Sequence, residues 1–297
     1  MKTNSLLLVL ILSYALAFGQ MVPKSVRDFQ NSRNTDTIAL VLNKLHQSSD
    51  YLLTPQNRIQ HQKALEGISV HQMHKYGNQI DRIYNDFSAK KDCDPEFYKV
   101  ILKYRALLDY RRDRYSDAVN GFNEYFRLSK TFTIRDTLLA GDYAPLAVCF
   151  YKLDSTDQFF SLIDSGIALS TKKRNPFNDL SLMYYTSGTY FSSIRQVDTA
   201  RILFDKAQKY WNQSHNKDYK LISELYKKLS YIELISENNE LALDYLNQSL
   251  TNLLKSNHDE IEMASIIRDK GKILLTENQL AESIKQFKMA IHIIENE

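Results

Sequence analysis

The chain has 297 residues, of which 43% are hydrophobic and 25% charged, a balance that is ordinary for globular proteins and excludes a disordered chain. Eight Gly and five Pro supply too few turns for a many-stranded β fold, so we expect long helices joined by short loops. The formal net charge is +3 and no long basic block occurs, which argues against a nucleic-acid partner.

Residues 1–19 have the pattern of a cleavable secretion signal. An apolar run from Leu6 to Phe18 follows Lys2, and small residues precede an expected cut ahead of Gln20. The run is shorter than the roughly 20 apolar residues that span a membrane, although an uncleaved anchor stays open as an alternative. We therefore expect a mature chain without a membrane span, located in the periplasm or secreted.

Residues 20–94 are expected to form N-terminal helices. Helical apolar spacing occurs in residues 35–46, 56–76 and 78–88, which is compatible with a degenerate repeat and a cap. This region ends in a polar linker that contains Cys93.

The chain has two cysteines, which permit one disulfide in an oxidising compartment. Cys149 falls within an expected helix, where a free thiol packs as a small apolar side chain. Because Cys93 lies in the polar linker, we expect no disulfide between the two.

A periodic series of aromatic and small residues lies in the middle of the chain. Its members are Tyr184, Gly188, Phe191, Ala200, Phe204 and Ala207. The first three share one face of a helix and the last three share one face of a second helix, with a turn near residues 195–198. Small side chains at Gly188 and Ala207 let the helices approach closely, because a larger one would cost about 1–3 kcal/mol through overpacking.

This series resembles the tetratricopeptide repeat (TPR), in which aromatic and small residues recur at the same intervals. Steps of about 41 residues from Gly188 reach further small residues, namely Ala106, Ala147, Ser230 and Gly271. The positions that correspond to Ala207 hold Tyr125, Gly166, Ser249 and Ala290. Tyr125 does not fit a small-residue position. The unit is longer than the usual 34 residues, so each helix pair is expected to carry extra turns.

The resemblance implies an all-α fold, a right-handed α-solenoid of antiparallel helix pairs like the TPR superhelix. It covers residues 95–297 and predicts five repeats there. The order of an export signal followed by long-period repeats also resembles the periplasmic TPR regions of Bacteroidetes membrane regulators, which suggests a sensor or scaffold in signalling. The repeat length is similar to that of cytoplasmic peptide-pheromone receptors, but the export signal argues against that compartment.

No sequence motif for catalysis is present. A Gly-rich phosphate loop, a nucleophile elbow, a kinase signature and a zinc-protease helix are all missing from the sequence. His71 and His74 could share one side of a helix, but a third metal ligand at fixed spacing is absent. We therefore expect no enzyme, no cofactor and no metal site.

The TPR resemblance implies a concave groove lined by the first helix of each unit. Groove-facing positions lie three before, one after and four after each small residue, which places them on one stripe of a helix. The aromatic and basic residues at these positions are Lys103, Tyr110, Tyr151, Tyr185, Lys227, Tyr231, Arg268 and Lys272. They suit an extended acidic peptide, although each of them could instead serve packing or be solvated.

The sequence therefore favours an interaction module that binds a protein or peptide in its groove. A small-molecule or glycan binder is the alternative, and it requires an enclosed pocket rather than an open channel. The sequence ends at Glu297, a few residues past the last expected helix, so we also expect an uncovered apolar edge there that could support self-association.

Overall fold

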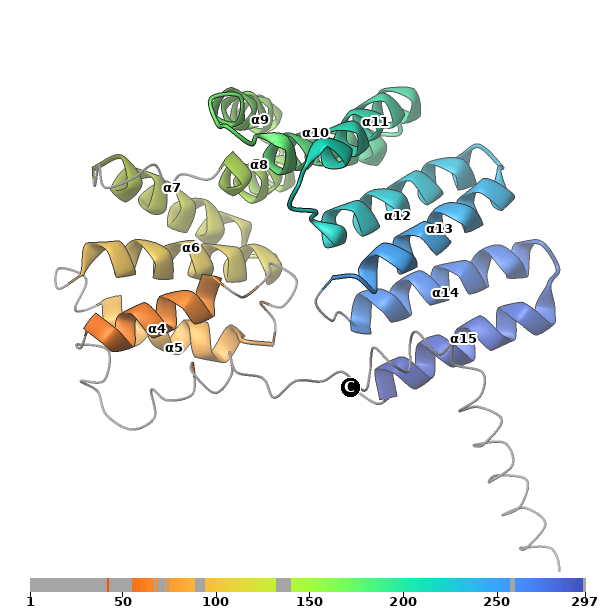
Figure 1. Cartoon of the computed structure of the whole chain (residues 1–297), viewed down its shortest axis with the longest axis horizontal. Helices are drawn as coiled ribbons and strands as arrows, with labels where there is room; N and C mark the ends of the chain where they lie inside the picture. Colours follow the sequence, from red (N-terminus) through yellow and green to blue (C-terminus); the bar gives the residue numbers. More distant parts are fainter. Residues whose placement is uncertain are drawn as a thin grey trace, which may run out of the picture. The chain divides into compact units, whose positions relative to one another are not determined.

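The computed structural model describes residues 42, 55–66, 68, 73, 75–88, 94–131, 140–256 and 260–295. These residues form twelve α-helices and one short 3-10 helix, and they contain no strand, which confirms the predicted all-α class (Figure 1). None of these helices is long and apolar enough to cross a membrane. Four predicted features lie outside the described residues: the signal at 1–19, Cys93, His71 and His74.

The described chain divides into two compact units between Lys217 and Asp218. The boundary predicted between residues 94 and 95 stays a prediction. The helices of the first unit are α4 (Pro55–Glu66), α5 (Gly77–Ser88), α6 (Pro95–Arg111), α7 (Tyr115–Thr131), α8 (Tyr143–Lys152), α9 (Thr156–Ser170), α10 (Phe177–Ser193) and α11 (Val197–Gln213). The helices of the second unit are α12 (Tyr219–Ile235), α13 (Asn239–Leu253), α14 (Glu260–Thr276) and α15 (Leu280–Glu295).

The helix predicted at 56–76 is shorter in the structure. It ends at Glu66, and Met73 and Tyr76 lie in a turn although both side chains are buried. Gly67 follows Glu66 in the sequence, and glycine is the residue type that most often ends a helix. Apolar spacing alone could not reveal this, because the turn residues still supply apolar side chains to the core.

Five consecutive pairs, from α6–α7 to α14–α15, each pack as two antiparallel helices joined by a short turn. In the following text, the first helix of a pair is α6, α8, α10, α12 or α14. The small residues that recur about every 41 residues are all buried on first helices: Ala106, Ala147, Gly188, Ser230 and Gly271. The 41-residue spacing therefore reflects packing within the pairs.

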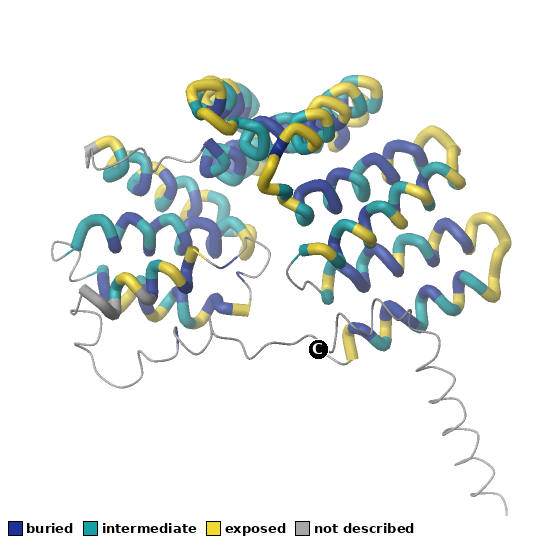
Figure 2. The backbone as a smooth tube through the Cα atoms, in the orientation of Figure 1, coloured by how far each residue is buried: buried dark blue, intermediate teal, exposed yellow. Residues whose placement is uncertain are grey.

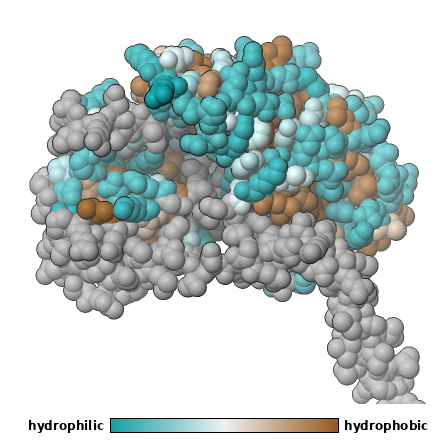
Figure 3. All heavy atoms as spheres, viewed as in Figure 1, coloured by the Kyte–Doolittle hydropathy of each residue, from teal (hydrophilic) through white to brown (hydrophobic). Residues whose placement is uncertain are grey.

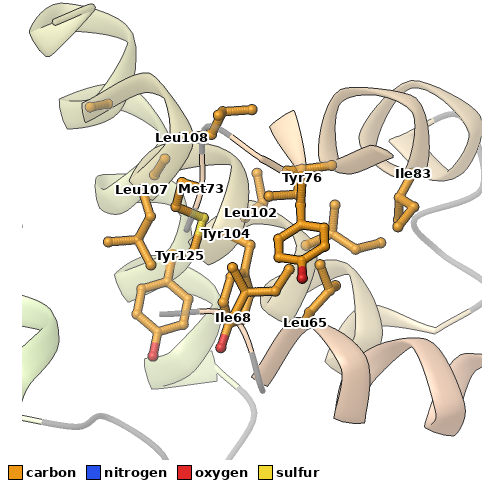
Figure 4. Close-up of a cluster of buried hydrophobic side chains, with 14 of the residues drawn as sticks. Leu65, Ile68, Met73, Tyr76, Ile83, Leu102, Tyr104, Leu107, Leu108 and Tyr125 are labelled. Carbon is orange, nitrogen blue, oxygen red and sulfur yellow. The ribbon is translucent and has the colours of Figure 1, made fainter. Parts of the chain in front are cut away.

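The first unit contains an extended apolar core. Phe87, Phe97 and Phe122 are fully buried in it, and Figure 4 shows side chains from α6 and α7 gathered around Met73 and Tyr76. Cys149 is buried and carries a free thiol, as expected. Burial raises the pKa of this thiol to about 12, so the thiolate needed for reaction with oxidants is scarce at neutral pH.

The turn within every pair has the same backbone geometry. The residue two positions before the second helix of each pair has a left-handed backbone, with φ between 57° and 60°. None of these residues is glycine: they are Asp113, Asp154, Arg195, Glu237 and Asn278. In the α10–α11 turn, the Arg195 amide donates to the Ser192 carbonyl, and the Gln196 amide donates to the Phe191 carbonyl. This bond pattern is the Schellman motif, and it recurs in the other four turns. Figure 2 shows exposed segments at the α12–α13 and α14–α15 turns.

Glycine at the left-handed position should stabilise the protein. A left-handed conformation costs an L-residue about 1–2 kcal/mol, whereas glycine adopts it freely but loses more entropy on folding. We expect Arg195→Gly and Glu237→Gly each to raise the free energy of unfolding by about 0.5–1 kcal/mol. Urea denaturation followed by circular dichroism measures the change. Arg195→Ala is the matched control, and a similar gain in that variant would contradict the backbone explanation.

Candidate peptide-binding face of the first helices

The eight predicted groove residues all lie on first helices. They are Lys103 and Tyr110 on α6, Tyr151 on α8, Tyr185 on α10, Lys227 and Tyr231 on α12, and Arg268 and Lys272 on α14. The structure separates them into side chains that hold neighbouring helices together and side chains that are exposed. Most of the predicted groove residues in the first unit hold neighbouring helices together.

Lys103 takes part in a buried ion pair. Its Nζ lies 2.6 Å from Oδ1 of Asp142, and only 18% of the Lys103 side chain and 8% of the Asp142 side chain are exposed. Asp142 stands at the end of the 3-10 helix Ala140–Asp142, directly before α8. Lys103 therefore joins α6 to the start of the next pair, and its charge is already neutralised.

The same contact explains why Tyr125 occupies a position that is small in the other repeats. The Tyr125 hydroxyl donates to Oδ2 of Asp142 at 2.6 Å, and the Lys103 ammonium lies 6.0 Å from the centre of the Tyr125 ring. Burial raises the pKa of Tyr125 further above its ordinary value, with the Asp142 charge as the second cause. α8 begins only at Tyr143, so Asp142 stands directly before it, where the Tyr125 hydroxyl reaches it.

The predicted tyrosines of the first unit pack against other aromatic rings. Tyr151 meets Tyr190 edge to face, with 5.2 Å between ring centres, and its hydroxyl lies 2.8 Å from Oγ of Ser193. Both contacts join α8 to α10. Tyr110 and Tyr185 are likewise partly buried beside rings of their own pairs. All three tyrosines are therefore only partly exposed.

In the second unit, Lys227 fixes the register between the two first helices. Its Nζ donates to Oε1 of Glu262 at 2.9 Å and to Oγ of Ser265 at 2.8 Å. Both partners are on α14, 35 and 38 residues further along the chain. With an offset of this size, Tyr231 on α12 corresponds in register to Arg268 on α14, and Ile235 corresponds to Lys272.

The exposed members of the predicted set lie in this second unit. Tyr231 is 50% exposed, and the side chains of Arg268 and Lys272 are 51% and 61% exposed. Two apolar neighbours, Ile235 and Leu275, are also exposed, at 45% and 48%. We refer to these five residues as the α12–α14 face. Figure 3 shows apolar side chains among hydrophilic ones on the surface of the C-terminal helices.

The α12–α14 face combines apolar area with an excess of positive charge. Arg268 and Lys272 each have a nitrogen 3.1 Å from the same atom, Oδ1 of Asp269. Two cations that share one carboxylate leave one net positive charge at the face. A carboxylate of a partner would find both an ion-pair partner and adjoining apolar contacts there.

Ile235 was missed by the sequence analysis. It lies one helical turn beyond Tyr231, so the two side chains share a stripe of α12. The predicted groove positions lie three before, one after and four after each small residue. Ile235 lies five residues after Ser230 and is therefore not among them. A signal was available, because an apolar residue recurs at this position in earlier pairs, as Leu153 and Ile194, which lie 82 and 41 residues before Ile235.

The described residues show no constellation that would support metal chemistry, since no group of three His, Cys, Asp or Glu side chains could hold an ion there. A depression lined by Asn238, Glu240, Leu241 and Asp244 lies at the start of α13 and is open to solvent. It belongs to a second helix and does not coincide with the α12–α14 face.

Solved structures of helical repeat proteins superpose on this chain. A Rap protein complexed with competence and sporulation factor matches with a TM-score of 0.59 and 10% identity, over 88% of this chain and 78% of that chain. The chain has a TPR-like helical repeat fold. The Rap conjugation gene regulator of plasmid pLS20, in complex with the Phr* peptide, matches this TPR-like chain with a TM-score of 0.57 and 15% identity, over 88% and 76% of the two chains.

A chain of the APC/C hetero-tetramer Cut9–Hcn1 also matches, with a TM-score of 0.56 and 18% identity. The alignment covers 92% of the TPR-like chain but only 49% of that longer one. At these identities the likeness shows a shared fold. No protein-family model and no curated protein matches the sequence.

Proposed function

We propose that this TPR-like protein is an interaction module that binds a peptide or a protein segment along its first helices. The observation that carries the proposal is the α12–α14 face, where Tyr231, Ile235 and Leu275 are each about half exposed beside two cations. Tyrosine provides a large contact area at a small cost in side-chain entropy, and the cations favour a partner with an acidic group.

Two further observations support this proposal. A Rap protein of similar fold has been solved in complex with the Phr* peptide, so such helical repeats can accommodate this class of ligand. The alternative, a small-molecule or glycan binder, calls for an enclosed pocket, whereas the depression at the start of α13 is open. A shallow face with apolar and charged residues suits an extended chain better than a small solute.

The proposed cellular role follows from the N-terminal sequence. The predicted signal at residues 1–19 would deliver the mature protein to the periplasm or the medium, where a peptide-binding module can act as a sensor or a scaffold in signalling. Participation of Lys103, Tyr110, Tyr151, Tyr185 and Lys227 in binding stays a prediction. Their contacts within the protein make them weaker candidates than the exposed residues of α12 and α14.

Selection from random peptides displayed on phage tests the proposal with a defined probe. We expect enriched peptides to combine an acidic group with apolar residues, because both are complementary to the α12–α14 face. Fluorescence anisotropy with one enriched synthetic peptide should show that Tyr231→Ala weakens binding at least about tenfold, since central aromatic residues dominate such interfaces.

Ile202→Ala is the matched control for this experiment. Ile202 is 57% exposed, a fraction similar to the 50% of Tyr231, but it lies on α11, which is a second helix. The control variant should bind the peptide like the wild type. Equal affinity of the Tyr231→Ala variant, or a selection that enriches nothing above the bare support, would contradict the proposed function.

A further inference from the structure

The outward side of α15 carries an apolar stripe with the spacing of a helix–helix seam. Four of its side chains are 53–58% exposed, namely Leu280, Ile284, Ile291 and Ile294. Phe287, in the middle of the stripe, is partly exposed. The steps between the five residues alternate between four and three, which is the pattern of residues that meet along a coiled-coil seam. Single exposed apolar residues are ordinary, but a stripe along a whole helix is not.

The fold shows what such a stripe does when a neighbour is present. Leu243 and Leu250 occupy the corresponding positions of α13, 41 residues earlier than Ile284 and Ile291. They pack against the cluster that contains Met263 and Ile267 of α14. The stripe of α13 is therefore covered by a helix, whereas Ile284 and Ile291 at the corresponding positions of α15 are exposed.

We propose that the α15 stripe, defined as Leu280, Ile284, Phe287, Ile291 and Ile294, is the contact through which two copies of this chain pair. The alternating steps of four and three read the same in both directions, so the stripe can match itself when two copies run antiparallel around a two-fold axis. In this arrangement Ile284 meets Phe287 of the second copy, and Leu280 meets Ile291. The proposal goes beyond the proposed function, because it concerns a different helix and a different partner.

The flanking residues are compatible with this pairing. Setting Ile284 against Phe287 of the second copy places Lys288 opposite Ala281, the exposed small residue in the first turn of α15. Like charges therefore do not face each other along the seam.

The length of the stripe sets the strength of the pairing. A helix of 16 residues extends about 24 Å, so the contact is smaller than the roughly 800 Å² per partner of a standard interface. The dimer should therefore be weak and in exchange with the monomer.

Sedimentation equilibrium of the full mature chain between about 5 and about 500 µM tests the pairing. The weight-average mass of the wild type should rise with concentration toward twice the monomer value. The doubly substituted Ile284→Glu, Ile291→Glu chain should stay monomeric, because a two-fold contact brings four carboxylates into one seam. Ile202→Glu, which changes an equally exposed isoleucine on α11, should associate like the wild type.

A wild type that stays monomeric over the whole range overturns the proposal, and so does unchanged association of the double variant. Leu280→Lys serves as a second variant if the double one loses helicity by circular dichroism, because Leu280 is the first residue of α15, is 56% exposed and meets Ile291 of the second copy in this arrangement. Association of Leu280→Lys at wild-type strength would likewise count against the seam. Binding of the enriched peptide to the α12–α14 face is measured separately in the same variants, so failure of one proposal does not imply failure of the other.

Discussion

Gly188→Leu is expected to lower the free energy of unfolding by about 3 kcal/mol or more, the upper range for overpacking a tightly packed interior. A Cβ atom built on Gly188 would lie 2.6 Å from both Cδ1 and Cε1 of Phe204, closer than such atoms approach in real structures. Phe204 is fully buried, so its ring cannot move into solvent. The two helices of the α10–α11 pair would have to separate along their contact.

Urea denaturation can locate this damage as well as measure it. Trp211, the single tryptophan of the chain, lies on α11 in the affected pair, so its fluorescence reports on this unit while circular dichroism reports on all helices. Gly141→Ala is the control, because a Cβ there would lie 3.4 Å from a Leu182 methyl group, an ordinary contact. Equal midpoints for the wild type and Gly188→Leu would show that the pair does not depend on close approach at this residue.

Lys103→Ala is expected to lower the free energy of unfolding by about 3–5 kcal/mol, the usual cost of removing one partner of a buried ion pair. The Asp142 carboxylate would lose its cationic partner in a site where only 8% of its side chain is exposed. The Tyr125 hydroxyl would still donate a hydrogen bond to it. The comparison is Lys272→Ala, whose side chain is 61% exposed, and which should change stability by no more than about 1 kcal/mol.

A double-mutant cycle separates the ion pair from the loss of packing. Lys103→Met combined with Asp142→Asn removes both charges and keeps most of the volume, so it should be more stable than Lys103→Met alone. Thermal and urea denaturation of the four proteins give the coupling energy. If Lys103→Ala and Lys272→Ala have the same free energy of unfolding, then the Lys103–Asp142 ion pair does not stabilise the fold. Lys103 would then be a candidate for ligand binding again.

The helix pairs could be predicted from the sequence because their packing requires a small residue at fixed intervals. Gly188 and Gly271 are opposed by the rings of Phe204 and Phe287, and the spacing of these residues follows from helix geometry alone. In the structure, the small residue of each predicted unit lies on the first helix of one of the five pairs. Tyr125 was an exception that only Asp142, 17 residues away, could explain.

The candidate site was less accessible to sequence reasoning. A stripe rule placed Lys103 and Lys227 in a groove, but it could not foresee that Asp142 and Glu262 would reach them from other helices. Ion pairing and exposure depend on which side chains the fold brings together, whereas the rule uses positions on a single helix. The sequence predicted a turn near residues 195–198, but not its left-handed backbone, because Arg195 or Glu237 at that position carries no glycine signal.

The repeated turns have a consequence for how the surface of this protein can change. Each turn is closed by hydrogen bonds between backbone groups, so its shape does not depend on which side chain stands at the left-handed position. Aspartate, arginine, glutamate and asparagine all occupy that position in this one chain. The tips of the helix pairs can therefore acquire almost any charge or polarity by substitution while the architecture beneath them is preserved.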